Sequence, residues 1–208
     1  HCRGLLAEFG IIMPLGADKV RHLFAEILND ENSSVPLLIK DLLQQHLQDL
    51  ARLEQRIEAI DKQLAEWAKT NQQAMTLLQM LGVGVITATA FAAGVCDAQL
   101  FENGRQFAAW LGLVPRQYSS GGKNKLDSIT KAGDVYLRTM LAQGARSIVF
   151  NAKKKSDPFS LWIQRLLERA GMNKTVIAVA AKQARIMWAI MAKNQDYQPE
   201  RICSPLSA

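Results

Sequence analysis

The feature that most constrains this chain is a regular spacing of large side chains between residues 39 and 67. The positions lie alternately four and three residues apart, and His46 is the one polar residue among them. They are Ile39, Leu43, His46, Leu50, Leu53, Ile57, Ile60, Leu64 and Trp67. This spacing is typical of a coiled-coil seam and predicts a long helix over residues 35–70. Its apolar stripe needs a cover, which is either another helix of this chain or a second copy in a dimer.

The rest of the sequence is also predominantly helical in its pattern. Apolar residues recur three and four residues apart, and no convincing alternation of a strand appears. Helix-start signals occur at Asn103 and at Asp157-Pro158, and Gly171 is a C-terminal stop. The sequence therefore predicts an all-α fold, with further helices at about 5–12, 17–29, 134–152, 158–171 and 174–193.

A glycine-containing turn interrupts the helical pattern at "LLQMLGVGVITATAFAAGV". Gly82 and Gly84 allow a tight connection, which predicts an element resembling a helix-hairpin-helix. The amides that open its second helix could face a phosphate group without using side chains. An ordinary turn between two helices explains the same residues.

Several classes of protein and of site are excluded by the composition. Of the 208 residues, 49% are apolar, which is enough to bury a core. The apolar runs near residue 180 contain Lys182, Gln183 and Arg185 and are too short for a membrane span. The three cysteines lack metal-ligand spacing, so we expect a reducing, cytoplasmic compartment. No acidic grouping resembles a two-metal nuclease site.

Positive charge is concentrated in one part of the chain. Residues 113–155 contain nine lysines and arginines and two aspartates, a net charge of 9 − 2 = +7. The whole chain carries +6, so the remainder carries 6 − 7 = −1. Such a local excess predicts a polyanionic partner, nucleic acid first, although a solvated basic face has the same composition.

The basic region contains an unusual segment, "GLVPRQYSSGGKNKLDSITKAGD" at residues 112–134, which we expect to form a loop. All three histidines lie far upstream of its serines, so a Ser-His-Asp hydrolase lacks its base. A serine beside glycines and bases suits phosphodiester exchange, because Arg116, Lys123 and Lys131 could neutralise a pentacovalent phosphate. The glycines, Gly121 and Gly122, would let the DNA backbone approach. A flexible basic loop whose serines bond backbone or phosphate is the alternative.

The order of motifs between about Leu77 and Arg146 resembles the C-terminal transposase domain of the insertion sequence 110/1111 family, to which pilin-gene invertases are related. The motifs are L-x-G-V-G, "RQFAAWLGLVPR", "YSSG" and "TKAGDVYLR". The upstream seam and "RGLLAEFGI" are similar to the region that joins this domain to its partner domain.

The resemblance implies a DNA recombinase of a bacterial mobile element that oligomerises as a dimer or tetramer, is guided by a structured RNA, and acts in the cytoplasm at the nucleoid. The catalytic serine of the family maps to Ser120 through the motif Tyr118-Ser119-Ser120-Gly121. The resemblance implies no membrane partner. DNA contacts are expected at Gly82, Gly84, Arg116, Gly121, Lys123, Lys125, Lys131 and Arg138. A noncatalytic helical module for nucleic-acid binding and dimerisation remains the alternative.

The resemblance also implies what lies outside this chain. Family members carry an N-terminal RuvC-like domain whose four acids bind Mg²⁺, and no cofactor is expected in these 208 residues. We expect residues 1–34 to end the linker from that domain, 35–70 to form the coiled coil, 71–195 the transposase domain, and 196–208 a flexible tail. The chain begins with His1, which indicates a fragment that is inactive alone. Asp127 departs from the glycine common in relatives and could weaken phosphate binding.

Overall fold

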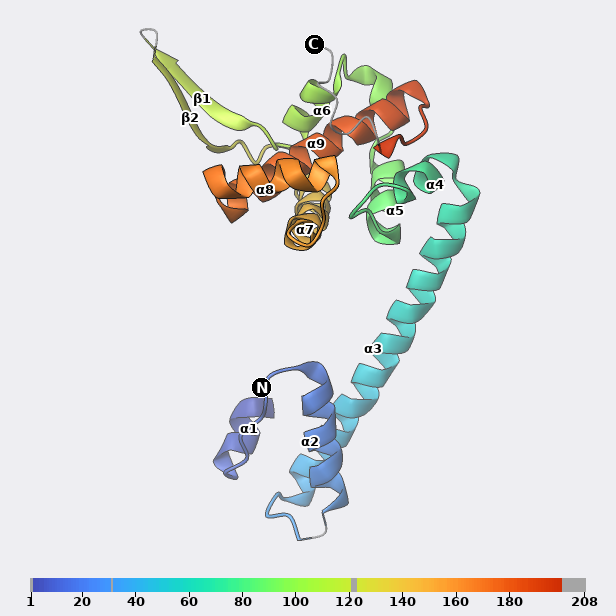
Figure 1. Ribbon diagram of the computed structural model, residues 1–208. Coiled ribbons are helices and arrows are strands. Elements are labelled where there is room, and N and C mark those ends of the chain that lie inside the picture. The colour runs from blue at the N-terminus through green and yellow to red at the C-terminus, as the bar shows by residue number, and fades with distance from the viewer. Residues whose placement is uncertain (1, 31, 121–122, 200–208) are drawn as a thin grey trace. The chain divides into compact units, whose positions relative to one another are not determined.

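The computed structural model describes residues 2–30, 32–120 and 123–199, but not the side chains of Ala17 and residues 119–126. The chain divides into two compact units, His1–Lys62 and Gln63–Ala208. The described residues are predominantly helical, which confirms the predicted fold class. Figure 1 labels the elements.

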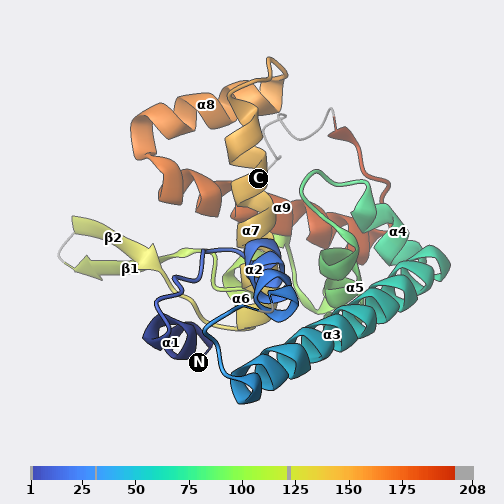
Figure 2. The ribbon, with the colours of Figure 1, turned by 90° about the horizontal axis from the view of Figure 1, so that it is seen from below.

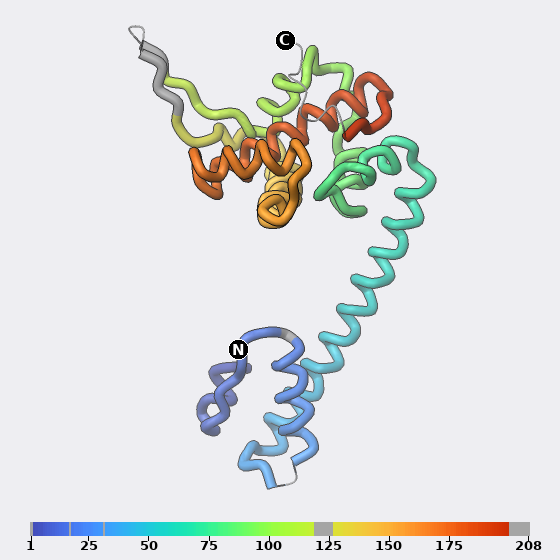
Figure 3. The backbone as a smooth tube through the Cα atoms, in the orientation of Figure 1, coloured from blue at the N-terminus to red at the C-terminus, as the bar shows by residue number. Residues whose placement is uncertain are grey.

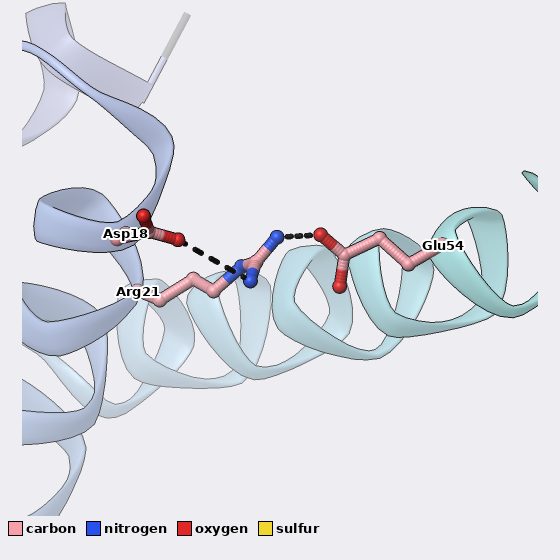
Figure 4. Close-up of polar contacts among 3 residues, drawn as sticks. All are labelled: Asp18, Arg21 and Glu54. Carbon is pink, nitrogen blue, oxygen red and sulfur yellow. Dashed lines mark ion pairs between the residues drawn. The ribbon is translucent and has the colours of Figure 1, made fainter. Parts of the chain in front are cut away.

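The first unit packs two helices against the beginning of a third. Helix α1 is Cys2–Glu8, α2 is Ala17–Asn29, and α3 is Leu37–Thr70. Its core contains five buried side chains, Leu6, Phe24, Ile27, Val35 and Leu43. On the surface, Arg21 of α2 forms an ion pair with Glu54 of α3, and its Nη1 lies 3.7 Å from Asp18 (Figure 4). Such an exposed pair stabilises by about 0–1 kcal/mol, so the apolar core dominates.

Helix α3 is a single unbroken helix of 34 residues over the predicted coiled-coil segment (Figure 3). At 1.5 Å per residue, it is about 50 Å long. The early seam residue Leu43 is buried in the core of the first unit, but Leu53, Ile57 and Ile60 are 52%, 58% and 52% exposed. No described residue covers these three, and coiled-coil pairing therefore stays a prediction.

The second unit is built around α9, Met172–Lys193. Packed against it are α4 (Gln72–Leu78), the 3-10 helix η1 (Ala98–Leu100), α6 (Gly104–Trp110), α7 (Val135–Ala152) and α8 (Pro158–Ala170). Helix α5, Val85–Gly94, packs against α4 and α7. Seen from below, α7 crosses α9 (Figure 2). Nine residues of α9 are buried in this core, from Thr175 to Met191.

Aromatic side chains close the core on the α6 side. The rings of Phe101 and Phe107 meet edge to face with centroids 5.1 Å apart, and Phe107 also faces Phe91 at 6.4 Å. The indole N–H of Trp188 donates to the carbonyls of Ala98 and Phe101 at 3.1 and 3.2 Å. This satisfies the polar end of a large side chain of α9 and fixes η1 against it.

By length and composition, α9 is the one described helix that could cross a membrane. Half of its apolar window is buried inside the unit, which is how the central helix of a packed core passes the same test.

Short polar side chains begin several helices of the second unit. Asn103 Oδ1 accepts from the amides of Arg105 and Gln106, which confirms the predicted cap of α6. Asp157 Oδ1 accepts from Ser160 N, and Pro158 occupies the first turn of α8 as predicted. The hydroxyl of Ser160 donates to Asp157 Oδ2 at 2.6 Å, and this bond, with those from backbone amides, lowers the pKa of Asp157.

The prediction of a loop at residues 112–134 is wrong for most of this range. Strand β1, Pro115–Ser120, pairs antiparallel with β2, Lys123–Ile129, in a two-stranded hairpin. The hairpin projects from the second unit (Figure 1). Because its described side chains at Arg116, Tyr118 and Asp127 are exposed, neither strand shows the apolar alternation that marks a strand with one buried face.

Candidate nucleic-acid interface

The serine segment lies at the far end of the hairpin. In the backbone register, Tyr118 pairs with Lys125, Ser119 with Asn124, and Ser120 with Lys123. Ser120 is therefore the last residue of β1, and Lys123 is the first of β2. Gly121 and Gly122 lie outside the described residues, as do the side chains of Ser120, Lys123 and Lys125. The backbone thus places the predicted nucleophile, Ser120, and two lysines predicted to contact DNA at the same tip of the hairpin.

The base of the hairpin is held by close backbone contacts with the end of α6. Gly112 has a φ of +71° and Gly133 a φ of +75°, and a Cβ at either would collide with the backbone of the other segment, at Ala132 and Trp110 respectively. The amide of Lys131 donates to Gly112 O at 3.2 Å, and Thr130 N donates to Val114 O at 2.9 Å. These contacts explain both glycines and fix the direction in which the hairpin leaves the unit.

Lys131 adopts a left-handed backbone conformation with a φ of +56°. This region is strained for a residue with a Cβ, and it occurs here where the chain turns from β2 into α7. The side chain of Lys131 is exposed beside the turn. The predicted phosphate-binding lysine therefore lies at a strained backbone position, held by its amide hydrogen bond to Gly112.

Two predicted DNA-binding arginines also bond to the hairpin base. Arg138 Nη1, from the first turns of α7, donates to Leu111 O at 3.2 Å and Ala132 O at 2.8 Å. Arg116 Nη2 donates to Thr130 O at 3.3 Å. Arg138 thereby joins α6, the turn and α7, while the exposed Arg116 links the two strands beside their bulge. Both guanidinium groups add positive charge at the base of the hairpin.

The two predicted glycines of the α4–α5 turn have different environments. Gly82 has a φ of +71°, and its backbone lies against Gly144 of α7 so closely that a Cβ on either glycine would collide with the other's carbonyl oxygen. Gly84 is the N-cap of α5 and has open space around it. Gly82 is therefore explained by packing, while Gly84 leaves the amides of α5 accessible. The phosphate contact at this turn stays a prediction.

A distant side chain fixes this turn. Gln183 of α9 is 3% exposed, and its Nε2 donates to Leu81 O at 2.6 Å across 102 residues of sequence. Tyr197, beyond α9, is also anchored at Leu81, and burial raises the pKa of its phenol. Sequence reasoning missed both anchors, since neither residue stands in a local motif. Only the polar Gln183 within the apolar run of α9 gave a signal.

The predicted site residues thus fall into three groups, two of which adjoin α7. The hairpin tip carries Ser120, Lys123 and Lys125, and its base brings together Arg116, Lys131 and Arg138. The α4–α5 turn meets α7 at Gly144, six residues beyond Arg138 or about 9 Å of helix rise. Among the described residues, no group of three or more His, Cys, Asp or Glu is placed to hold a metal ion.

The comparisons with known proteins agree with the order of these motifs. Residues 74–160, from α4 to the first turn of α8, match the transposase IS116/IS110/IS902 family. The chain is 41% identical over 198 residues to a probable family 20 transposase of Pseudomonas aeruginosa, a match that covers 95% of this chain and 59% of that protein. It is 38% identical over 196 residues to the transposase for insertion sequence element IS1111A of Coxiella burnetii, covering 94% and 54%.

A more distant relative has a different name. The pilin gene-inverting protein of Moraxella bovis is 26% identical over 129 residues, which covers 61% of this chain and 39% of that protein. The chain spans between half and three fifths of the length of the transposases it matches most strongly. The family match includes the glycine turn, the hairpin and α7, which together make up the candidate interface. Residues 74–160 of this chain are therefore a transposase domain of the IS116/IS110/IS902 family.

Proposed function

We propose that this chain acts in DNA transposition, where it binds DNA and supplies the serine that cleaves and rejoins strands. The observation that carries the proposal is that the family match contains the whole hairpin. Ser120 lies at its tip, and three positively charged side chains lie at its base. The +7 charge of residues 113–155 provides the attraction for a polyanion.

Ser120 is the proposed nucleophile. Its hydroxyl oxygen bonds to phosphorus and gives up its proton, while the bond from phosphorus to one deoxyribose oxygen breaks and that oxygen takes up a proton. The resulting serine phosphodiester conserves the energy of the broken phosphodiester bond. A deoxyribose hydroxyl of another strand can therefore displace the serine in the reverse reaction. Positive groups at the hairpin, including Arg116 and Lys131, stabilise the charge on the pentacovalent phosphate.

Other parts of the proposal concern the partners of this chain. The acids for Mg²⁺ belong to a RuvC-like domain, and a structured guide RNA selects the target. Homo-oligomerisation occurs through the exposed seam of α3, where Leu53, Ile57 and Ile60 are about half exposed.

The test compares two adjacent serines in the chain reconstituted with the RuvC-like domain, Mg²⁺ and guide RNA of its family. Ser120→Ala should abolish strand exchange and leave DNA affinity within about fivefold, since an ordinary hydrogen bond is worth about 1 kcal/mol. Ser119→Ala, the matched control, should remain active. Denaturing gels should show a protein–DNA adduct that is absent only from the Ser120 variant.

Two outcomes would contradict this assignment. If Ser119→Ala loses exchange and the adduct while Ser120→Ala keeps both, the nucleophile is the other serine. If both variants remain active, the hairpin serves binding alone, and the chain is the noncatalytic nucleic-acid-binding and dimerisation module.

A further inference from the structure

Helix α7 has one face in the core and an opposite face that no described residue covers. Leu137, Leu141, Ala145 and Val149 are buried toward α9 and its neighbours. At 100° per residue, the opposite face is a stripe about 100° wide whose residues are all exposed. These residues are Tyr136, Thr139, Gln143, Arg146, Ser147 and Phe150.

Two aromatic rings stand at the ends of this stripe. Tyr136 is 53% exposed and Phe150 is 63% exposed, although large aromatic side chains are usually well buried. They lie 14 residues apart, which is about 21 Å along the helix and the length of about six nucleotides at 3.4 Å per phosphate. Neither ring contributes to the core, so both are available to another molecule.

The charge around these rings indicates what that molecule is. Helix α7 contains two arginines and no acidic residue, and Lys153, Lys154 and Lys155 follow it directly. Arg146 lies one turn before Phe150 on the same stripe, and all three lysines are exposed. Exposed aromatic rings beside lysine and arginine side chains suit a nucleic acid as the partner. Its nucleobases stack on the rings while its phosphates pair with the positive charges.

We infer that the exposed face of α7 binds a single strand of DNA, with unpaired bases stacked on Phe150 and Tyr136. The inference rests on the proposed function, because strand exchange separates strands and leaves bases unpaired. A duplex offers its phosphates but not the faces of its stacked bases, so the aromatic rings would add nothing to duplex binding. The stripe begins at Tyr136, two residues beyond the N-cap Asp134, and thus continues from the hairpin base.

The experiment measures the affinity of the whole 208-residue chain for a fluorescein-labelled dodecamer of thymidylate and for a 12-base-pair duplex, by fluorescence anisotropy at one fixed salt concentration. Phe150→Ala should weaken single-strand binding about 5- to 100-fold, the range of one lost base–aromatic stack, and change duplex binding less than twofold. Phe150→Trp, which keeps an aromatic ring at this position, should bind the single strand as tightly as the wild-type chain does. Leu100→Ala, which truncates a residue 78% exposed on η1, is the matched control and should change neither affinity.

A second measurement locates the contact directly. A dodecamer containing 5-iododeoxyuridine should photocrosslink to Phe150 or Tyr136, and peptide mass spectrometry should identify the linked residue. Crosslinks confined to other elements would overturn the inference.

The outcomes separate the two proposals. If the wild-type chain binds neither probe, DNA binding itself fails and the proposed function fails with it. If it binds duplex but Phe150→Ala leaves single-strand affinity unchanged, or weakens both probes equally, the stacking face alone is wrong. A ribonucleotide dodecamer that binds more tightly and depends more on Phe150 would assign the face to RNA. Self-association abolished by Phe150→Ala would assign it to a second copy of the chain.

Discussion

Helices α3 and α9 are the two longest of the described residues, with 34 and 22 residues, and both carry apolar side chains at helical spacing. Helix α9 buries nine residues among five neighbouring elements, whereas the seam of α3 leaves Leu53, Ile57 and Ile60 about half exposed. The same periodicity therefore has two outcomes. A periodic pattern specifies a helix and its apolar face, but the cover of that face depends on what else the chain folds beside it.

The largest effect is expected where α3 lacks its cover. Replacing Leu53, Ile57 and Ile60 together with Gln should weaken self-association of the chain about 10⁴-fold, since about 1 kcal/mol is lost for each half-exposed side chain that a partner would bury and a dimer contains six of them. Analytical ultracentrifugation over a range of concentrations measures this. The control variant has Gln in place of Arg52, Arg56 and Lys62, which are three exposed residues off the seam. A wild-type chain that stays monomeric at high micromolar concentration would contradict intermolecular pairing.

The buried helix should respond to a single truncation. Met187 is fully buried on α9, so Met187→Ala should lower the free energy of unfolding of the second unit by about 2–5 kcal/mol. All four tryptophans lie in residues 63–208, and their fluorescence during urea unfolding reports on this unit. Leu53→Ala, the corresponding truncation on α3, should leave that transition unchanged. Equal losses from both would mean that the two helices are packed alike.

Glycine-to-alanine changes should have opposite signs in the two units. Gly144→Ala places a Cβ against the carbonyl of Gly82 and should destabilise the second unit by about 1–3 kcal/mol, despite the better helix propensity of alanine. Gly4→Ala in α1 meets open space and should stabilise the first unit by about 0.5–1 kcal/mol. Circular dichroism at 222 nm during thermal unfolding measures both. Stabilisation by Gly144→Ala would show that the turn does not pack against α7.

The sequence predicted the helices well because period and caps are local signals. The Asn103 and Asp157 caps and the single helix over α3 were found this way. The hairpin was missed because its strands project from the unit, and strands without a buried face carry no apolar alternation. The Gly121-Gly122 pair between two extended runs was the one available hairpin signal.

The candidate site was predictable only in part. Motif order identified the basic residues around the hairpin, but their environments depend on contacts across the fold. Arg138 reaches Leu111, and Gln183 reaches Leu81 across 102 residues, and no local pattern records either bond. The exposed stripe of α7 could have been found by plotting the helix on a wheel, since Tyr136, Arg146 and Phe150 share one face.

The central position of α9 also matters during synthesis. Residues 63–171 leave the ribosome before α9, and at about 5–20 residues per second the first of them wait about 7–26 s for the end of the helix that fills their core. Helices α4 to α8 can form in that interval but cannot bury the apolar surfaces that pack against α9. Residues 1–62, whose core closes with Leu43, need no later segment. The first unit therefore closes its core while the second is still an intermediate with exposed apolar faces. Premature stop codons before residue 172 should yield protein for degradation or chaperone capture rather than a truncated domain.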